Sequence, residues 1–94
     1  MLTEYIEAAM RHATYEIIED DYPHYGEIPV CRGVWANEAT LEKCRIELRS
    51  VLEDWILIHV RDRAPLPIVD GIDLTCWSLT DEEMSARLEE LEKL

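Results

Sequence analysis

The sequence predicts an α+β domain: a small antiparallel sheet of three to four strands backed by a long helix, with flanking helices at the N-terminal and C-terminal ends. Two observations support this class. Apolar residues recur at helical spacing from Leu41 onward, and three short extended runs between residues 14 and 36 are separated by turn-forming residues. A chain of 94 residues can bury one hydrophobic core but not two, so we expect a single domain over residues 1–94.

The first predicted element is a helix over residues 2–12. Its apolar residues recur three and four positions apart, which places them on one helix face: Leu2, Tyr5, Ile6, Ala9, Met10 and Ala13. From Thr14 the pattern changes to alternation, with Tyr15, Ile17 and Glu19 on one side. This alternation predicts a strand that ends at the turn-forming run 20–23.

Two further strands are predicted before the long helix. The run 25–30 is extended, and because Pro29 cannot donate a hydrogen bond, the strand must lie at an edge or leave the sheet near that residue. Residues 31–33 form a turn into a third strand over 34–36. The run 37–40 then ends the sheet region.

The long helix is predicted over residues 41–60. Thr40 can cap its N-terminus through its hydroxyl oxygen. Charges of both signs, including Arg49 and Glu53 four residues apart, fall mostly off the apolar stripe and indicate a solvated face. The stripe itself is expected to face the sheet, which gives a unit of sheet and long helix over 14–70: Leu41, Cys44, Leu48, Val51, Leu52, Trp55 and Ile58.

The remainder of the chain is expected to return across the core. Prolines at 65 and 67 predict an extended piece over 66–69, which could rejoin the sheet as an edge strand before a turn at 70–71. A capping box at 80–83 predicts a C-terminal helix over 80–92. Large apolar residues are interpreted as core anchors: Trp35, Trp55, Ile72, Leu74 and Trp77.

Charge restricts the class of partner. There are 21 acidic residues against 9 Lys and Arg, which gives a net charge of −12 at pH 7. Nucleic-acid affinity depends largely on Lys and Arg, so we expect no direct nucleic-acid binding by this chain alone, whereas a basic protein would be attracted. No apolar run is long enough to span a bilayer and no signal peptide is recognisable at the N-terminus, so we expect no membrane association and a cytoplasmic location.

The residues give no pattern for catalysis, a metal or a cofactor, so we expect none of the three. The side chains of Asp20 and Asp21 would point in opposite directions at a strand end, which makes a poor two-metal nuclease clamp. If the chain were a metal-dependent nuclease, it would cleave nucleic acid only with magnesium, and Asp20→Asn or Asp21→Asn would abolish that cleavage. The histidines lack metal-ligand spacing and the cysteines lack a CxxC pair, and we expect reduced, mostly buried thiols: His12, His24, His59, Cys31, Cys44 and Cys76.

The segment from Thr14 to Cys31 is the candidate binding site. It contains no Lys or Arg, and its acids alternate with tyrosines, which are favoured anchors at protein interfaces. The alternative is a solvated strand edge whose charges prevent aggregation. An exposed edge would also permit pairing with a second copy, so we expect a homo-oligomer. The expected partner-binding residues are Glu16, Glu19, Asp20, Asp21, Tyr22, His24, Tyr25 and Glu27.

Three segments in order carry a family resemblance: 21–29 (DYPHYGEIP), 33–36 (GVWA) and 39–44 (ATLEKC). Together they resemble the HicB antitoxin family over roughly residues 14–70. The resemblance implies a HicB-like, partial ribonuclease H-like fold that binds and inhibits HicA, a small basic RNase toxin. The alternative is a solitary HicB-like scaffold or regulatory adaptor that binds another protein.

The chain departs from this family at its C-terminal end. Many members carry a DNA-binding segment there, whereas residues 78–94 predict a single acidic helix. Operator binding by this chain alone is therefore not expected.

Overall fold

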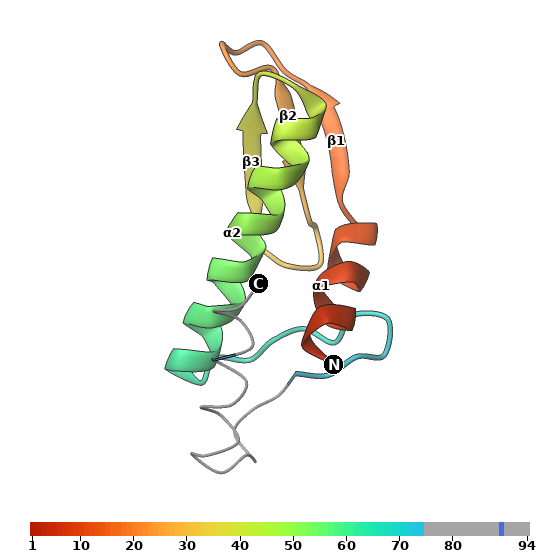
Figure 1. Ribbon diagram of the computed structural model, residues 1–94, viewed down its shortest axis with the longest axis vertical. Helices are drawn as coiled ribbons and strands as arrows, with labels where there is room; N and C mark the ends of the chain where they lie inside the picture. Colours follow the sequence, from red (N-terminus) through yellow and green to blue (C-terminus); the bar gives the residue numbers. More distant parts are fainter. Residues whose placement is uncertain (75–88, 90–94) are drawn as a thin grey trace.

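The computed structural model describes residues 1–74 and 89, which form two helices and a three-stranded sheet (Figure 1). In chain order these are α1 (Leu2–Arg11), β1 (Thr14–Ile17), β2 (His24–Glu27), β3 (Trp35–Glu38) and α2 (Leu41–Asp62). The sheet is an antiparallel meander in the order β1-β2-β3, and α2 packs mainly across β3 and β2 (Figure 1). The α+β class, the antiparallel sheet and the long helix behind it are confirmed.

Small residues allow α2 to approach the sheet closely. Tyr15 lies opposite Gly26, and Gly26 lies opposite Ala36, so these three residues share the face turned toward α2. A Cβ atom at Gly26 would lie 2.9 Å from two ring atoms of Tyr15 and 3.2 Å from the Sγ atom of Cys44. The Cys44 thiol also donates a hydrogen bond to the Ala36 carbonyl, with an Sγ to O distance of 3.5 Å. Glycine at position 26 therefore makes room for both the ring and the helix.

The cap and most of the predicted stripe of α2 are confirmed. The Lys43 backbone N–H donates to Thr40 Oγ1 at 3.1 Å, and Arg49 pairs with Glu53 at 3.2 Å. The stripe is wrong at two positions, because Leu41 is 41% exposed at the helix start and Ile58 is 48% exposed. Ile58 follows the buried Ile56 by two residues and therefore lies about 200° around the helix from it. The buried row instead follows a four-residue spacing and continues further: Cys44, Leu48, Leu52, Ile56 and Val60.

The predicted strand boundaries differ from the structure in several places. β1 stops at Ile17, β2 runs from His24 to Glu27, and β3 includes residues 37 and 38, which had been expected to end the sheet region. Position 37 pairs with Tyr25 and position 38 with His24, so cross-strand pairing overrides their turn propensity. The chain does leave the sheet before Pro29, as that proline predicted.

The segment after α2 does not rejoin the sheet, so the predicted edge strand over 66–69 is wrong. Among the described residues, Val69 forms a β-bridge with Ile72 alone, around a turn at Asp70 and Gly71, both of which have positive φ. This segment instead packs on α1. The Tyr5 hydroxyl donates to the Pro67 carbonyl at 2.7 Å, and burial raises the pKa of Tyr5.

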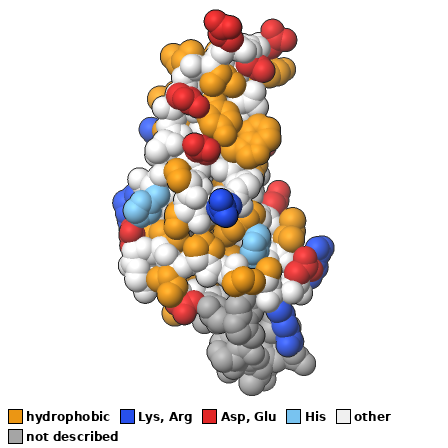
Figure 2. All heavy atoms as spheres, turned by 180° about the vertical axis from the view of Figure 1, so that it is seen from behind, with side chains coloured by type: hydrophobic (Ala, Val, Ile, Leu, Met, Phe, Trp, Pro, Cys, Tyr) orange, Lys and Arg blue, Asp and Glu red, His pale blue; other side chains and the backbone are white. Residues whose placement is uncertain are grey.

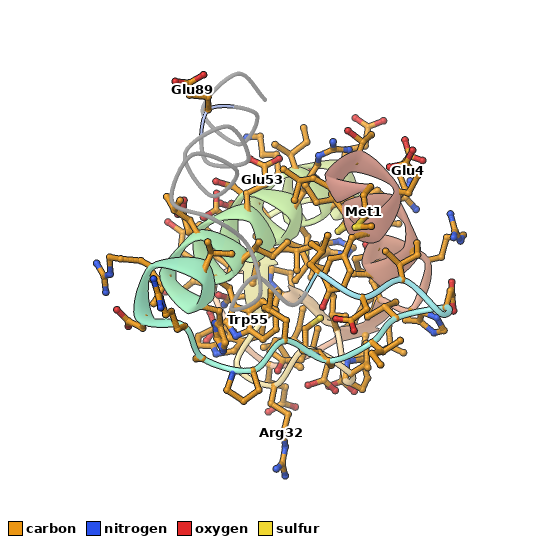
Figure 3. The ribbon with its side chains drawn as sticks, turned by 90° about the horizontal axis from the view of Figure 1, so that it is seen from below. Met1, Glu4, Arg32, Glu53, Trp55 and Glu89 are labelled. Atoms are coloured by element: carbon orange, nitrogen blue, oxygen red, sulfur yellow. The ribbon has the colours of Figure 1, made fainter. Side chains whose placement is uncertain are left out.

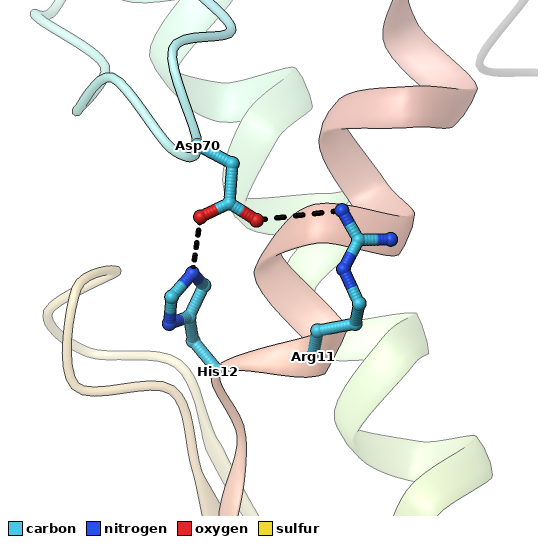
Figure 4. Close-up of polar contacts among 3 residues, drawn as sticks. All are labelled: Arg11, His12 and Asp70. Atoms are coloured by element: carbon cyan, nitrogen blue, oxygen red, sulfur yellow. Dashed lines mark hydrogen bonds and ion pairs between the residues drawn. The ribbon is translucent and has the colours of Figure 1, made fainter.

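A charged cluster fixes the 70–71 turn to the end of α1 (Figure 4). Asp70 Oδ1 lies 2.6 Å from His12 Nε2, and Asp70 Oδ2 lies 3.3 Å from Arg11 Nη2. The hydrogen bond with His12, together with Arg11, lowers the pKa of Asp70. All three side chains are exposed, so we expect this cluster to position the turn more than to stabilise the fold.

One hydrophobic cluster joins α1, α2, the segment 28–36 that connects β2 to β3, and the segment 66–74. The thiols of Cys31 and Cys44 are free and buried. No helix among residues 1–74 is long and apolar enough to cross a membrane. The predicted helix over 80–92, Cys76 and Trp77 lie outside the described residues. The core consists of Leu2, Tyr5, Ile6, Ala8, Ala9, Ile28, Cys31, Val34, Ala36, Leu48, Leu52, Ile56, Val60, Leu66, Val69 and Leu74.

Candidate protein-binding face

The sheet has a second face, turned away from α2, which we call the outer face. Strand alternation and the pairing register decide which residues it carries. Figure 2 views the molecule from the side opposite to Figure 1 and shows acidic side chains around hydrophobic ones over the sheet. The outer face consists of Thr14, Glu16, Tyr25, Glu27, Trp35 and Asn37.

Two stacked aromatic rings form the centre of the outer face. The ring centroids of Tyr25 and Trp35 are 6.1 Å apart and their planes differ by 25°. Trp35 is 53% exposed, so the expectation that it anchors the core is wrong. It lies between the buried residues Val34 and Ala36, and the period of a strand therefore turns its indole to the opposite side.

Acidic groups border these rings directly. The Tyr25 hydroxyl donates a hydrogen bond to Glu27 Oε2 at 3.3 Å. Desolvation raises the pKa of Tyr25, and the negative charges of Glu27 and Glu16 raise it further. Both carboxylates are therefore close enough to the phenol to influence it, which places negative charge at the edge of an aromatic surface.

Internal cations do not neutralise these acids within the described part of the chain. Glu16, Glu19, Asp20, Asp21 and Glu27 are all exposed, and none forms an ion pair with another described residue. The guanidinium of Arg45 lies over the Tyr15 ring, on the side of the sheet that faces α2. Arg32 extends from the body of the molecule on the side opposite α2, which is also the side of the outer face, but it forms no ion pair with these acids (Figure 3). These acids therefore outnumber the cations on this side of the described chain.

The loop between β1 and β2 extends this surface beyond the end of the sheet. The Ile18 N–H donates to the Pro23 carbonyl at 2.8 Å, and the Tyr22 N–H donates to Asp20 Oδ1 at 3.0 Å. The Asn37 side-chain amide on β3 donates to the Tyr22 carbonyl at 3.3 Å. These bonds hold the loop against the sheet, and Tyr22 remains 53% exposed.

The structure divides the expected binding residues between three places. Glu16, Tyr25 and Glu27 share the outer face, and residues 19–22 form the adjoining loop. His24 is half-buried and lies on the face turned toward α2, opposite to its neighbour Tyr25. Sequence reasoning missed Trp35 as a surface residue, although the alternation of buried and exposed positions around it carried the signal.

The side chains of this face can contact cationic groups, and the described residues show no metal cluster. Among residues 1–74 and 89, no group of His, Cys, Asp and Glu side chains could hold a metal ion. The Asp20 carboxylate accepts a bond from the Tyr22 backbone and so belongs to a turn. Burial raises the pKa of the Cys31 thiol to about 11, so little thiolate is present at neutral pH. Exposed aromatics beside carboxylates instead suit cationic side chains, through cation–π contacts and charge-assisted hydrogen bonds.

Comparisons with known proteins agree with the fold. The chain belongs to the UPF0150-like family, whose model matches residues 4–67. It is also similar to the crystal structure of TTHA0281 from Thermus thermophilus, with 41% sequence identity and a TM-score of 0.75. That match covers 78% of this chain and 90% of the other. No match to a curated protein was found.

Proposed function

We propose that the chain is a HicB-like antitoxin, with a partial ribonuclease H-like fold, that binds and inhibits a small basic HicA-like mRNA-cleaving toxin. The observation that supports this best is the outer face, where the Tyr25–Trp35 stack lies beside Glu16 and Glu27. The three segments that resemble HicB lie within the residues matched by the family model. Inhibition would follow because the acidic face covers the basic surface that RNA must occupy.

The arrangement also suggests where binding energy concentrates. Trp35 offers a large, exposed and stacked aromatic surface, and such residues are frequent interface hot spots. The acids would mainly accelerate association and select for a cationic surface. We therefore expect Trp35→Ala to weaken toxin binding by at least about tenfold, through faster dissociation.

The experiment is to co-purify the chain with the product of the adjacent small reading frame and to measure RNA cleavage with and without it. The proposal is supported if the chain inhibits RNA cleavage by the toxin and if this inhibition is lost in Trp35→Ala and in Glu16→Gln/Glu27→Gln. The matched control is Glu7→Gln/Glu47→Gln, which removes the same charge from exposed positions on the two helices. No complex, or equal loss in both double variants, would overturn it.

A further inference from the structure

The pairing register places a carboxylate directly beside Trp35 on the outer face. Glu27 of β2 lies opposite Trp35 of β3. The Ile28 N–H donates to the Val34 carbonyl at 3.1 Å, which identifies residues 28 and 34 as a hydrogen-bonded pair. Because hydrogen-bonded and non-hydrogen-bonded pairs alternate along antiparallel strands, Glu27 and Trp35 form a non-hydrogen-bonded pair, in which facing side chains lie closer together. The Glu27 side chain is therefore held next to the indole ring of Trp35.

The Glu27 carboxylate keeps room for a further donor. Its Oε2 atom accepts a hydrogen bond from the Tyr25 hydroxyl at 3.3 Å, and no cation pairs with it among residues 1–74 and 89. An ionised carboxylate can accept about four hydrogen bonds, so one bond from a neutral phenol leaves most of its capacity unused. Glu16 lies opposite Tyr25 on β1. The aromatic pair is therefore bordered by two carboxylates that have no ion pair within the described chain.

The opposite face of the sheet already contains a cation over an aromatic ring. The guanidinium of Arg45, on α2, lies 5.7 Å from the centre of the Tyr15 ring. Within the described residues, neither Tyr25 nor Trp35 has such a contact, and Arg32, which precedes Trp35 by three residues, forms no ion pair. The outer face therefore offers rings and carboxylates to a cation that this part of the chain does not supply.

We propose that the outer face binds an arginine side chain of the partner, whose guanidinium stacks on Trp35 and donates hydrogen bonds to Glu27. This inference rests on the proposed function and names the chemical group that the site recognises. Glu16 and Glu27 are diagonal neighbours across β1 and β2, and such residues have Cα atoms ~7–8 Å apart. Both negative charges therefore attract the same bound cation.

Lysine fits this arrangement less well than arginine. A guanidinium is planar and weakly hydrated, so it can stack on an aromatic ring while the N–H groups at its edge donate to a neighbouring carboxylate. An ammonium group is compact and strongly hydrated, so contact with a ring displaces more tightly held water. The two side chains carry the same charge, and electrostatic attraction alone does not separate them. Selection of arginine over lysine therefore distinguishes this site from a surface that is only acidic.

The test compares two capped peptides of equal length and charge, one with two arginines and one with two lysines, each separated by glycine. Each peptide is titrated into the isotopically labelled full chain at low ionic strength. Binding is followed by nuclear magnetic resonance through the Trp35 indole N–H and the backbone amides of β2 and β3. We expect the arginine peptide to bind about two- to fivefold more tightly, which is the range of a cation–π contact at an exposed site. Equal affinities, or shifts confined to other parts of the chain, would overturn the proposal.

Three variants assign the preference to named side chains. Trp35→Leu removes the ring from an exposed position, and we expect it to abolish the preference for arginine while the lysine peptide binds as before. Glu27→Gln should weaken the binding of both peptides. The matched control is Glu47→Gln, which removes the same charge from an exposed position on α2 and should change neither affinity. A preference for arginine that survives Trp35→Leu contradicts the proposal.

The peptide experiment and the toxin experiment can fail separately. If the chain inhibits the toxin but binds the two peptides equally, the proposed function is retained and the arginine site is wrong. If the preference for arginine is found but no toxin is inhibited, the arginine site is retained and the proposed function is wrong.

Discussion

Replacing Gly26 with alanine tests the close approach of α2 to the sheet. The new Cβ atom would lie 2.9 Å from Cδ1 and Cε1 of Tyr15 and 3.2 Å from the Cys44 Sγ atom. Carbon atoms pack best at ~3.5–4.0 Å, so both the ring and the helix must move outward. Overpacking of this kind costs about 1–3 kcal/mol. For a small domain, that loss lowers the urea midpoint by about 1 M or more.

The assay is urea unfolding followed by circular dichroism, in a double-mutant cycle with Tyr15→Ala. Removing the ring takes away the two closest contacts, so we expect Gly26→Ala to cost less in that background. Gly33→Ala is the matched control, because Gly33 has φ of +96° and nothing within 4 Å of its added Cβ. Its cost is conformational and should not depend on Tyr15. An unchanged midpoint for Gly26→Ala, or equal loss in both backgrounds, would refute the reasoning.

Three further predictions concern the N-cap of α2, the two buried cysteine thiols and the loss of stability at acid pH. Thr40→Ala should lower the free energy of unfolding by about 1 kcal/mol while Thr40→Ser changes it little, as urea titration will show. Cys31 and Cys44 should react with a thiol reagent at pH 7 only after denaturant is added, because burial raises the pKa of each thiol. Since the folded-state pKa of Asp70 is lowered, its carboxylate contributes to the free energy of unfolding at pH values above its ordinary pKa of 3.8. This contribution is lost as the pH falls below that value, so Asp70→Asn should flatten this part of the pH profile of stability.

The spacing of apolar residues along the chain predicted most of the fold, because it matches the face that each helix or strand buries. The stripe of α1 and the Thr40 cap of α2 depend on neighbours within a few residues, and both were predictable. The run 66–69 has an extended pattern, but its partner is decided by long-range packing. It is fixed by the bond from Tyr5 to Pro67 and by the contact of Asp70 with α1, which sequence spacing does not indicate.

The candidate site was predictable in charge but not in geometry. The absence of Lys and Arg from residues 14–31 identified the acidic segment. Which acids share a face depends on register, and register also separates His24 from Tyr25. Trp35 was assigned to the core because tryptophan is usually buried, whereas the stack with Tyr25 forms between two strands and needs their alignment.

The acids of the outer face can be separated from the fold by measuring stability and binding on the same variants. Arg49 and Glu53 form an ion pair on α2, whereas Glu16 and Glu27 are exposed and have no ion pair with any other described residue. Unpaired surface acids in a chain of net charge −12 repel one another, so Glu16→Gln/Glu27→Gln should leave the free energy of unfolding within about 0.5 kcal/mol or raise it. Binding of a basic protein should weaken, most strongly at low ionic strength. If unfolding free energy falls while binding is unchanged, these carboxylates support the sheet and the partner-binding role is wrong.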